Sequence, residues 1–112
     1  MKDLRYSMLL DFYASALTEK QQALMEDYYN QDYSLGEIAK ASNTSRQAVM
    51  DGIKRAEGTL AKMEETLGLY AKYSKTMDAL EECLSLNEKG ERQALEKKLN
   101  FIKTIWEDEN GI

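Results

Sequence analysis

The sequence contains no histidine, no proline and a single cysteine, Cys83, among its 112 residues. Without histidine, the chain lacks the usual base for an activated nucleophile and the Glu-x-x-His ligands of carboxylate metal sites in helical bundles. Its few glycines stand apart and form no phosphate-binding loop. One cysteine cannot form an intrachain disulfide, which fits a reducing compartment, and a packed, inert thiol is expected. We therefore expect a protein that is not an enzyme and that uses no cofactor or metal.

Long apolar runs are also missing. No segment approaches the roughly 18 apolar residues that a membrane-spanning helix needs. Asp3 and Asp11 interrupt the N-terminal segment, where a signal peptide requires an unbroken apolar stretch. The sequence thus predicts a cytoplasmic protein without a membrane span.

The residues that are abundant favour helices. Ala, Leu, Glu, Lys, Gln and Met dominate, and the hydrophobic content of 43% suffices for one modest core. We expect an all-α fold. The net charge of -5 argues against a protein that coats nucleic acid indiscriminately, although a local basic patch remains compatible with it.

Apolar spacing and capping patterns divide the chain into helices. A first helix is expected over 2–17 and a second from Thr18, which forms a capping box with Gln21, to about Tyr29, with Leu24, Met25 and Tyr28 buried. Ser34 and Glu37 form another capping box that opens a helix over 35–42. Asn43 suits a left-handed turn, and a fourth helix begins at Thr44 or Ser45.

Two parts are expected, a helix-turn-helix domain over 1–63 and a C-terminal helical hairpin over 64–112. The hairpin comprises one long amphipathic helix after Glu64, a turn at 87–90, and a last helix with Leu95, Leu99, Ile102, Ile105 and Trp106 on one face. These apolar stripes need a partner, which is either the N-terminal domain or another copy of the protein.

Residues 34–60 have the plan of a helix-turn-helix unit, with Ala39 as the small residue at the crossing and Ile38 and Val49 as anchors. The second helix presents side chains that reach phosphates and base edges. The candidate nucleic-acid-binding residues are Ser45, Arg46, Gln47, Met50, Lys54 and Arg55. The alternative is a solvated helix face, with Ser45 only a helix cap and Asp51 paired with Arg55. Tyr29 and Tyr33, which flank a predicted loop, are the aromatic residues least clearly assigned to the core.

Several matched positions resemble region 4 of bacterial sigma factors. They are Leu17-Thr18 to Gln22, Glu37-Ile38-Ala39, Ser45, Val49, Ile53, Arg55-Ala56 and Leu60. Ser42 and Thr44 stand where that pattern usually places an apolar residue between the two helices.

A closer resemblance covers nearly the whole chain. Leu10-Asp11-Phe12-Tyr13, LTEKQ at 17–21, Tyr28-Tyr29, Asp32-Tyr33-Ser34-Leu35 and SRQAVMDGIKRAE at 45–57 resemble the YlxM family. This resemblance implies a small bacterial helix-turn-helix protein of the signal recognition particle pathway, acting as a regulator or as a binder of the particle's RNA.

Two other functions stay open at this point. The chain could be a protein-interaction adaptor that docks on the particle's GTPase components or on a ribosomal partner. It could also be a DNA-binding transcription regulator that forms a homodimer through the C-terminal hairpin and reads half-sites about one helical turn apart.

Overall fold

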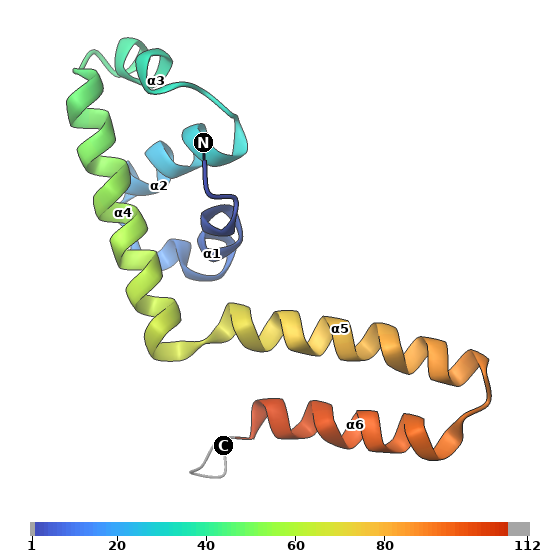
Figure 1. The fold of residues 1–112 in the computed structure, drawn as a ribbon. Helices are drawn as coiled ribbons and strands as arrows, with labels where there is room; N and C mark the ends of the chain where they lie inside the picture. Colours follow the sequence, from blue (N-terminus) through green and yellow to red (C-terminus); the bar gives the residue numbers. More distant parts are fainter. Residues whose placement is uncertain (1, 108–112) are drawn as a thin grey trace. The chain divides into compact units, whose positions relative to one another are not determined.

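The computed structural model describes residues 2–107, which form helices and turns and no strand. The α-helices are α1 (Arg5–Tyr13), α2 (Glu19–Met25), α3 (Leu35–Ala41), α4 (Arg46–Leu67), α5 (Leu69–Glu88) and α6 (Arg92–Trp106) (Figure 1). This confirms the all-α prediction. The chain forms two compact units, one up to Gly68 and one from Leu69 onward. No helix of the described part is long and apolar enough to cross a membrane.

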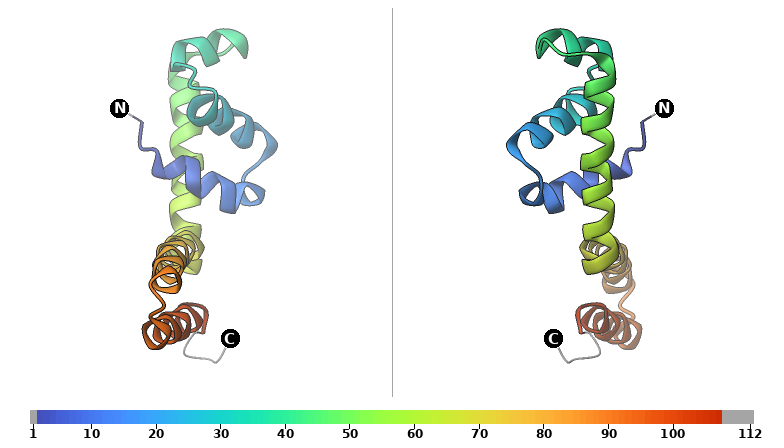
Figure 2. Two further views of the ribbon diagram at one scale, coloured as in Figure 1. Left: turned by 90° about the vertical axis from the view of Figure 1, so that its right-hand side faces the viewer. Right: turned by 90° about the vertical axis from the view of Figure 1, so that its left-hand side faces the viewer.

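The first unit is built around α4. Helices α1, α2 and α3 all contact it, and Figure 2 shows the three shorter helices gathered along this one long helix. The core lies where their apolar faces meet. Its buried side chains include Leu9, Leu10, Tyr13, Leu24, Met25, Ile38, Val49, Ile53, Ala56 and Leu60.

Both predicted capping boxes are present. The Thr18 hydroxyl accepts from the Gln21 amide at 3.1 Å, and the Gln21 side chain accepts from the Thr18 amide at 3.0 Å. Ser34 and Glu37 make the same pair of bonds at 3.1 and 3.0 Å. Each box satisfies two amides that helix geometry leaves without a partner, so the starts of α2 and α3 are fixed by local chemistry.

The first helix differs from its prediction at both ends. It begins at Arg5 instead of residue 2, because the Asp3 carboxylate accepts from the Arg5 amide at 3.0 Å and so occupies the helix start. The preceding Lys2 reaches away from the helix and donates to the carbonyl oxygens of Tyr28 at 2.6 Å and Tyr33 at 3.1 Å. At the other end, α1 gives way after Tyr13 to a 3-10 turn over Ala14–Ala16.

The second helix ends in a π turn, Glu26–Asn30, that changes which tyrosine is buried. Tyr28 was predicted to lie in the core beside Leu24 and Met25, but Tyr28 is half-buried and its neighbour Tyr29 is the buried one of the pair, at 9% exposure. A π turn closes hydrogen bonds five residues back, as from the Gln31 amide to the Glu26 carbonyl, and therefore shifts the helical phase.

The helix that follows the turn, α4, continues to Leu67. Residues 64–67, which the sequence assigned to the start of the hairpin, therefore form the last turn of α4. Gly68 ends it in the left-handed conformation, with φ of 63°, and its amide donates to the Glu64 carbonyl at 2.8 Å. Glycine adopts this conformation without steric cost, which makes Gly68 an effective stop.

The second unit is an antiparallel hairpin of α5 and α6, as the sequence predicts. The Trp106 indole N–H donates to the Thr76 hydroxyl at 2.7 Å, and the Lys98 ammonium pairs with the Glu82 carboxylate at 2.6 Å. The turn centres on Gly90, with φ of 71°, slightly later than expected because α5 extends to Glu88. Cys83 is a buried, free thiol, as predicted.

Candidate nucleic-acid interface

The turn between α3 and α4 has the helix-turn-helix geometry that the sequence predicts. Asn43 is left-handed, with φ of 56°, and the Thr44 amide donates to the Ala39 carbonyl at 3.0 Å. Ile38, Ala39 and Val49 are all buried, at 5% exposure or less, which confirms them as the two anchors and the small residue at the crossing. The two helices are thereby held at a fixed angle.

Ser45 caps α4. Its backbone is extended, and its hydroxyl accepts from the Ala48 amide at 3.0 Å. This confirms the predicted structural role of Ser45. The cap fixes the first turn of α4, from which the candidate side chains project.

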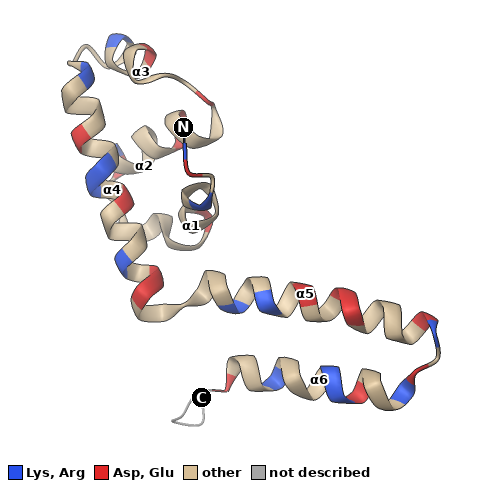
Figure 3. Ribbon diagram, in the orientation of Figure 1, with Lys and Arg blue, Asp and Glu red and all other residues tan. Residues whose placement is uncertain are grey.

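The remaining candidate residues lie outside the buried stripe of α4. Val49, Ile53, Ala56 and Leu60 form its buried stripe. Arg46, Gln47, Lys54 and Arg55 are exposed and Met50 is half-buried. We call this set, together with Ser45, the α4 face. Figure 3 shows blue segments in the first half of α4 with a red segment between them, and the acidic residue at this point of the sequence is Asp51.

Three of these residues gather around one shallow hollow. Arg46, Gln47 and Met50 line it together with Leu35 from the start of α3, and its volume is about 350 Å³. The Arg46 stem lies beside α3, since a side chain at Gly36 would come within 3.9 Å of the Arg46 Cδ. Lys54 and Arg55 stand farther along α4 and do not line the hollow.

Asp51 takes a different partner from the one expected. Its carboxylate accepts from the Gln47 side-chain amide at 2.9 Å. The predicted pairing with Arg55 is wrong, because no ion pair joins these two residues in the part of the chain that the structure describes. The Gln47–Asp51 bond orients the amide of Gln47 and leaves the Arg55 guanidinium separate from Asp51.

The start of α3 is a poorer place for an anion than the start of α4. The Ser34 backbone amide, followed by the Ser34 side chain, lowers the pKa of the Glu37 carboxyl. Glu37 therefore stays ionised at the helix start, where its negative charge occupies the position that a phosphate would prefer. The first turn of α4 contains no acidic residue.

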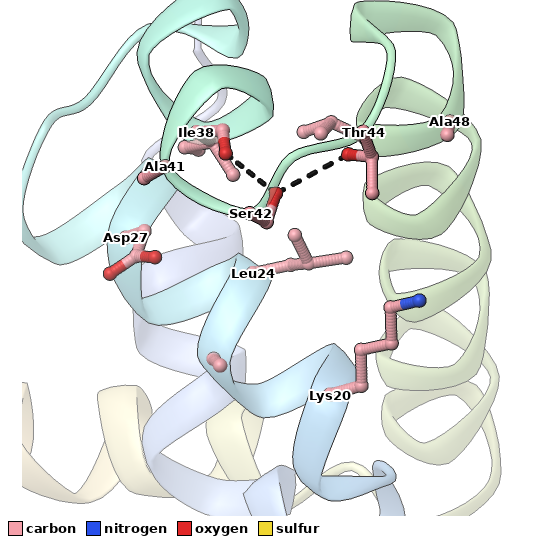
Figure 4. A pocket seen from close by; sticks show the side chains of 10 residues that line it. Lys20, Leu24, Asp27, Ile38, Ala41, Ser42, Thr44 and Ala48 are labelled. Atoms are coloured by element: carbon pink, nitrogen blue, oxygen red, sulfur yellow. Dashed lines mark hydrogen bonds between the residues drawn. The ribbon is translucent and has the colours of Figure 1, made fainter.

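The two residues that depart from the sigma pattern line a second hollow, shown in Figure 4. It has a volume of about 260 Å³ and lies among α2, α3 and α4, with Leu24, Ile38 and Val49 among its apolar lining. The Ser42 hydroxyl donates to the Ile38 carbonyl at 2.7 Å and lies 3.3 Å from the Thr44 hydroxyl. The turn thus keeps its hydrogen bonds, although no side chain fills the hollow.

Two tyrosines support α4 from behind in a way that the sequence did not indicate. The Tyr13 hydroxyl donates to the Glu64 carboxylate at 2.6 Å, and the Tyr29 hydroxyl donates to the Glu57 carboxylate. Burial, and then the neighbouring Glu57, raise the pKa of Tyr29 well above its ordinary value. Tyr29 is therefore a structural residue and not a stacking platform, whereas Tyr33 is 43% exposed.

Comparison with known proteins agrees with this arrangement. Residues 1–104 match the family described as "Putative helix-turn-helix protein, YlxM / p13 like". A UPF0122 protein of Desulforamulus reducens is 47% identical over 107 residues, which cover 92% of each chain. A UPF0122 protein of Halalkalibacterium halodurans is 48% identical over 98 residues, covering 88% of this chain and 87% of the relative. The chain belongs to the YlxM / p13-like family of helix-turn-helix proteins.

Proposed function

We propose that this protein is a non-enzymatic regulator that binds RNA or DNA with the α4 face. The observation that carries the proposal is the capped start of α4, which presents exposed basic side chains on a helix held by a buried helix-turn-helix crossing. Side chains in this position reach the groove and backbone of a nucleic acid in other helix-turn-helix proteins.

The residues of the face divide by chemistry. Arg46, Lys54 and Arg55 supply charge for phosphates, while Gln47 and Met50 offer an oriented amide and an apolar contact for base edges. Asp51 lies among them and repels phosphate, so the affinity is modest and falls as salt rises. The start of α4, and not that of α3, is the preferred anion position because Glu37 occupies the latter.

The proposed setting is the signal recognition particle pathway in the bacterial cytoplasm, with the particle's RNA as the ligand. The resemblance of nearly the whole chain to the YlxM family supports this setting. The sigma-like pattern of α3 and α4 supports duplex DNA as the other ligand to be tested.

A salt-dependent titration tests the α4 face. Fluorescence anisotropy of the full chain against the particle's RNA and against duplex DNA, at two salt concentrations, gives affinity and salt slope. Arg46→Ala with Lys54→Ala removes two charges from the face, so the slope of log affinity against log salt should fall by roughly 1.5 to 2.

The matched control is Arg5→Ala with Lys62→Ala, which removes the same charge from exposed positions outside the α4 face. The control should weaken binding far less than the face variant. Absence of saturable binding to either ligand, or equal losses in both double variants, rejects the proposal.

The second candidate is a protein-interaction adaptor for a GTPase component of the particle. The unfilled, polar-edged hollow at Ser42 and Thr44 favours it, because it gives a partner side chain a place to enter between the helices. Pull-downs before and after nuclease treatment separate the two functions. Partners bridged by RNA disappear after digestion, whereas direct protein partners stay bound.

A further inference from the structure

Helix α5 has two apolar stripes, and only one of them faces α6. The first stripe contains Ala79 and Cys83, which are buried, with Thr76 and Leu86 half-buried at the heptad-like spacing on either side. Each residue of the second stripe comes one position after a residue of the first stripe. It consists of Met77, Leu80 and Leu84, which are 43%, 39% and 68% exposed.

Helix α6 contributes further exposed apolar side chains to the edge of the hairpin that carries the second stripe. Because α5 and α6 run antiparallel, the residues one position after the contact stripe of each helix project from the same edge of the hairpin. On α6 these are Leu99 and Trp106, which are 48% and 44% exposed. We call Met77, Leu80, Leu84, Leu99 and Trp106 the hairpin face.

The opposite edge of the hairpin is polar. It bears the ion pair between Lys98 and Glu82, and the Lys98 ammonium also lies 5.2 Å from the centre of the Phe101 ring. Phe101 is 46% exposed and belongs to this polar edge. The hairpin face is therefore one-sided.

The hairpin buries very little by itself. Ala79 and Cys83 are its buried residues in the described part, α6 has none, and the largest fully buried side chains all lie in the other unit. The larger apolar residues Leu86, Leu95, Ile102 and Ile105 are only half-buried. Two helices alone therefore form a thin core, and stable helical layers need another apolar surface. The hairpin face provides that surface.

We infer that the hairpin face binds a second copy of this chain, giving a two-fold symmetric dimer with a four-helix core. Charge supports this occupant. By helical spacing, the α5 charges that flank the hairpin face are acidic, Glu81 and Glu88, while those of α6 are mostly basic, Arg92 and Lys103 against Glu96. In a symmetric pairing, α5 of each copy lies over α6 of the other, and both contacts join opposite charges.

The exposed area also fits a dimer. The exposed fractions of the five residues correspond to a few hundred Å² of apolar surface, about the size of the largest apolar patch on a typical monomer, which is often functional. A stable interface buries about 800 Å² on each partner, of which somewhat more than half is apolar. The hairpin face therefore supplies the apolar part of one standard interface. The dimer carries two α4 faces, which raises the affinity for a ligand with two sites.

Analytical ultracentrifugation of the full chain without nucleic acid tests this inference, so its outcome is independent of the proposed ligand. The wild type should sediment at twice the chain mass of 12.9 kDa at micromolar concentration. Leu99→Glu places a carboxylate opposite the acidic α5 of the other copy and should weaken the dimer roughly 30-fold or more.

Phe101→Glu is the matched control. It introduces the same charge on the same helix, at nearly the same exposure, but on the polar edge. It should leave the dimer intact, and circular dichroism of both variants checks that neither substitution unfolds the first unit. A wild type that stays monomeric at high micromolar concentration, or equal dissociation by the two variants, overturns the inference.

Discussion

The hydrogen bond from Tyr29 to Glu57 gives the sharpest stability prediction, because it joins the π turn to the middle of α4. The Tyr29 ring packs edge-on against Tyr28, with ring centres 5.1 Å apart, and the residue is 9% exposed. Tyr29→Phe keeps this packing and removes only the hydroxyl. The half-buried Glu57 carboxylate then loses its donor, so the free energy of unfolding should fall by about 1–2 kcal/mol.

The same residue makes stability depend on alkaline pH. Burial and the Glu57 carboxylate raise the pKa of folded Tyr29 above its ordinary value of 10.0. The unfolded chain releases this proton near pH 10 while the folded chain retains it. The stabilisation is therefore complete below pH 10 and declines as pH rises above it. Tyr29→Phe should lose less stability than the wild type over this range.

Urea unfolding followed by circular dichroism at neutral pH and above pH 10 measures both effects. Tyr33→Phe is the control, since Tyr33 is 43% exposed and should unfold like the wild type. A double-mutant cycle of Tyr29→Phe with Glu57→Gln should give a coupling energy of about 1 kcal/mol. If Tyr29→Phe matches the control at neutral pH, or keeps the wild-type pH slope, the structural role argued for this bond is wrong.

Three further predictions concern single residues of the first unit, each measured by urea unfolding. Gly58→Ala should stabilise α4 by about 0.5–1 kcal/mol because nothing lies within 4 Å of the added methyl. Gly52→Ala should add less stability, or remove some, because its Cβ would lie 2.7 Å from the Leu24 Cδ1. A larger gain at Gly52 would contradict the packing of α2 on α4. Ser45→Ala removes the α4 cap and should cost about 1 kcal/mol. Ser42→Leu should fill the hollow of Figure 4 and add about 1 kcal/mol, and a loss would show that its hydroxyl bonds matter more than burial.

The parts of the fold that the sequence predicts are those that depend on near neighbours. The capping boxes at Thr18 and Ser34, the left-handed Asn43 and the cap at Ser45 each join residues at most three positions apart. Side-chain chemistry at such spacing determines the local backbone with little help from the rest of the chain. The position of the candidate helix start was therefore predictable.

Contacts between distant residues were not predictable in this way. Lys2 holds the loop before α3 through carbonyl oxygens some thirty positions away, at Tyr28 and Tyr33, and no periodic pattern encodes such bonds. The burial of Tyr29 in place of Tyr28 depends on a π turn, which shifts the phase that a regular helix would keep. The orientation of the Gln47 amide likewise follows from which of two possible partners Asp51 takes.

Two of these distant contacts give acidic residues of α4 a hydrogen-bond partner. Glu57 and Glu64 both lie on this helix, and tyrosine hydroxyls of the core-side elements bind both carboxylates. Asp51 is then the acidic residue within the α4 face, and Gln47 already donates to it. Residues 45–62 carry four basic side chains against two acidic ones, so the local balance around Arg46, Lys54 and Arg55 is more favourable to phosphate than the net charge of -5 indicates. Because local potential governs the approach of a nucleic acid within a Debye length, we expect the charge of the α4 face to matter more for the proposed binding than the overall charge.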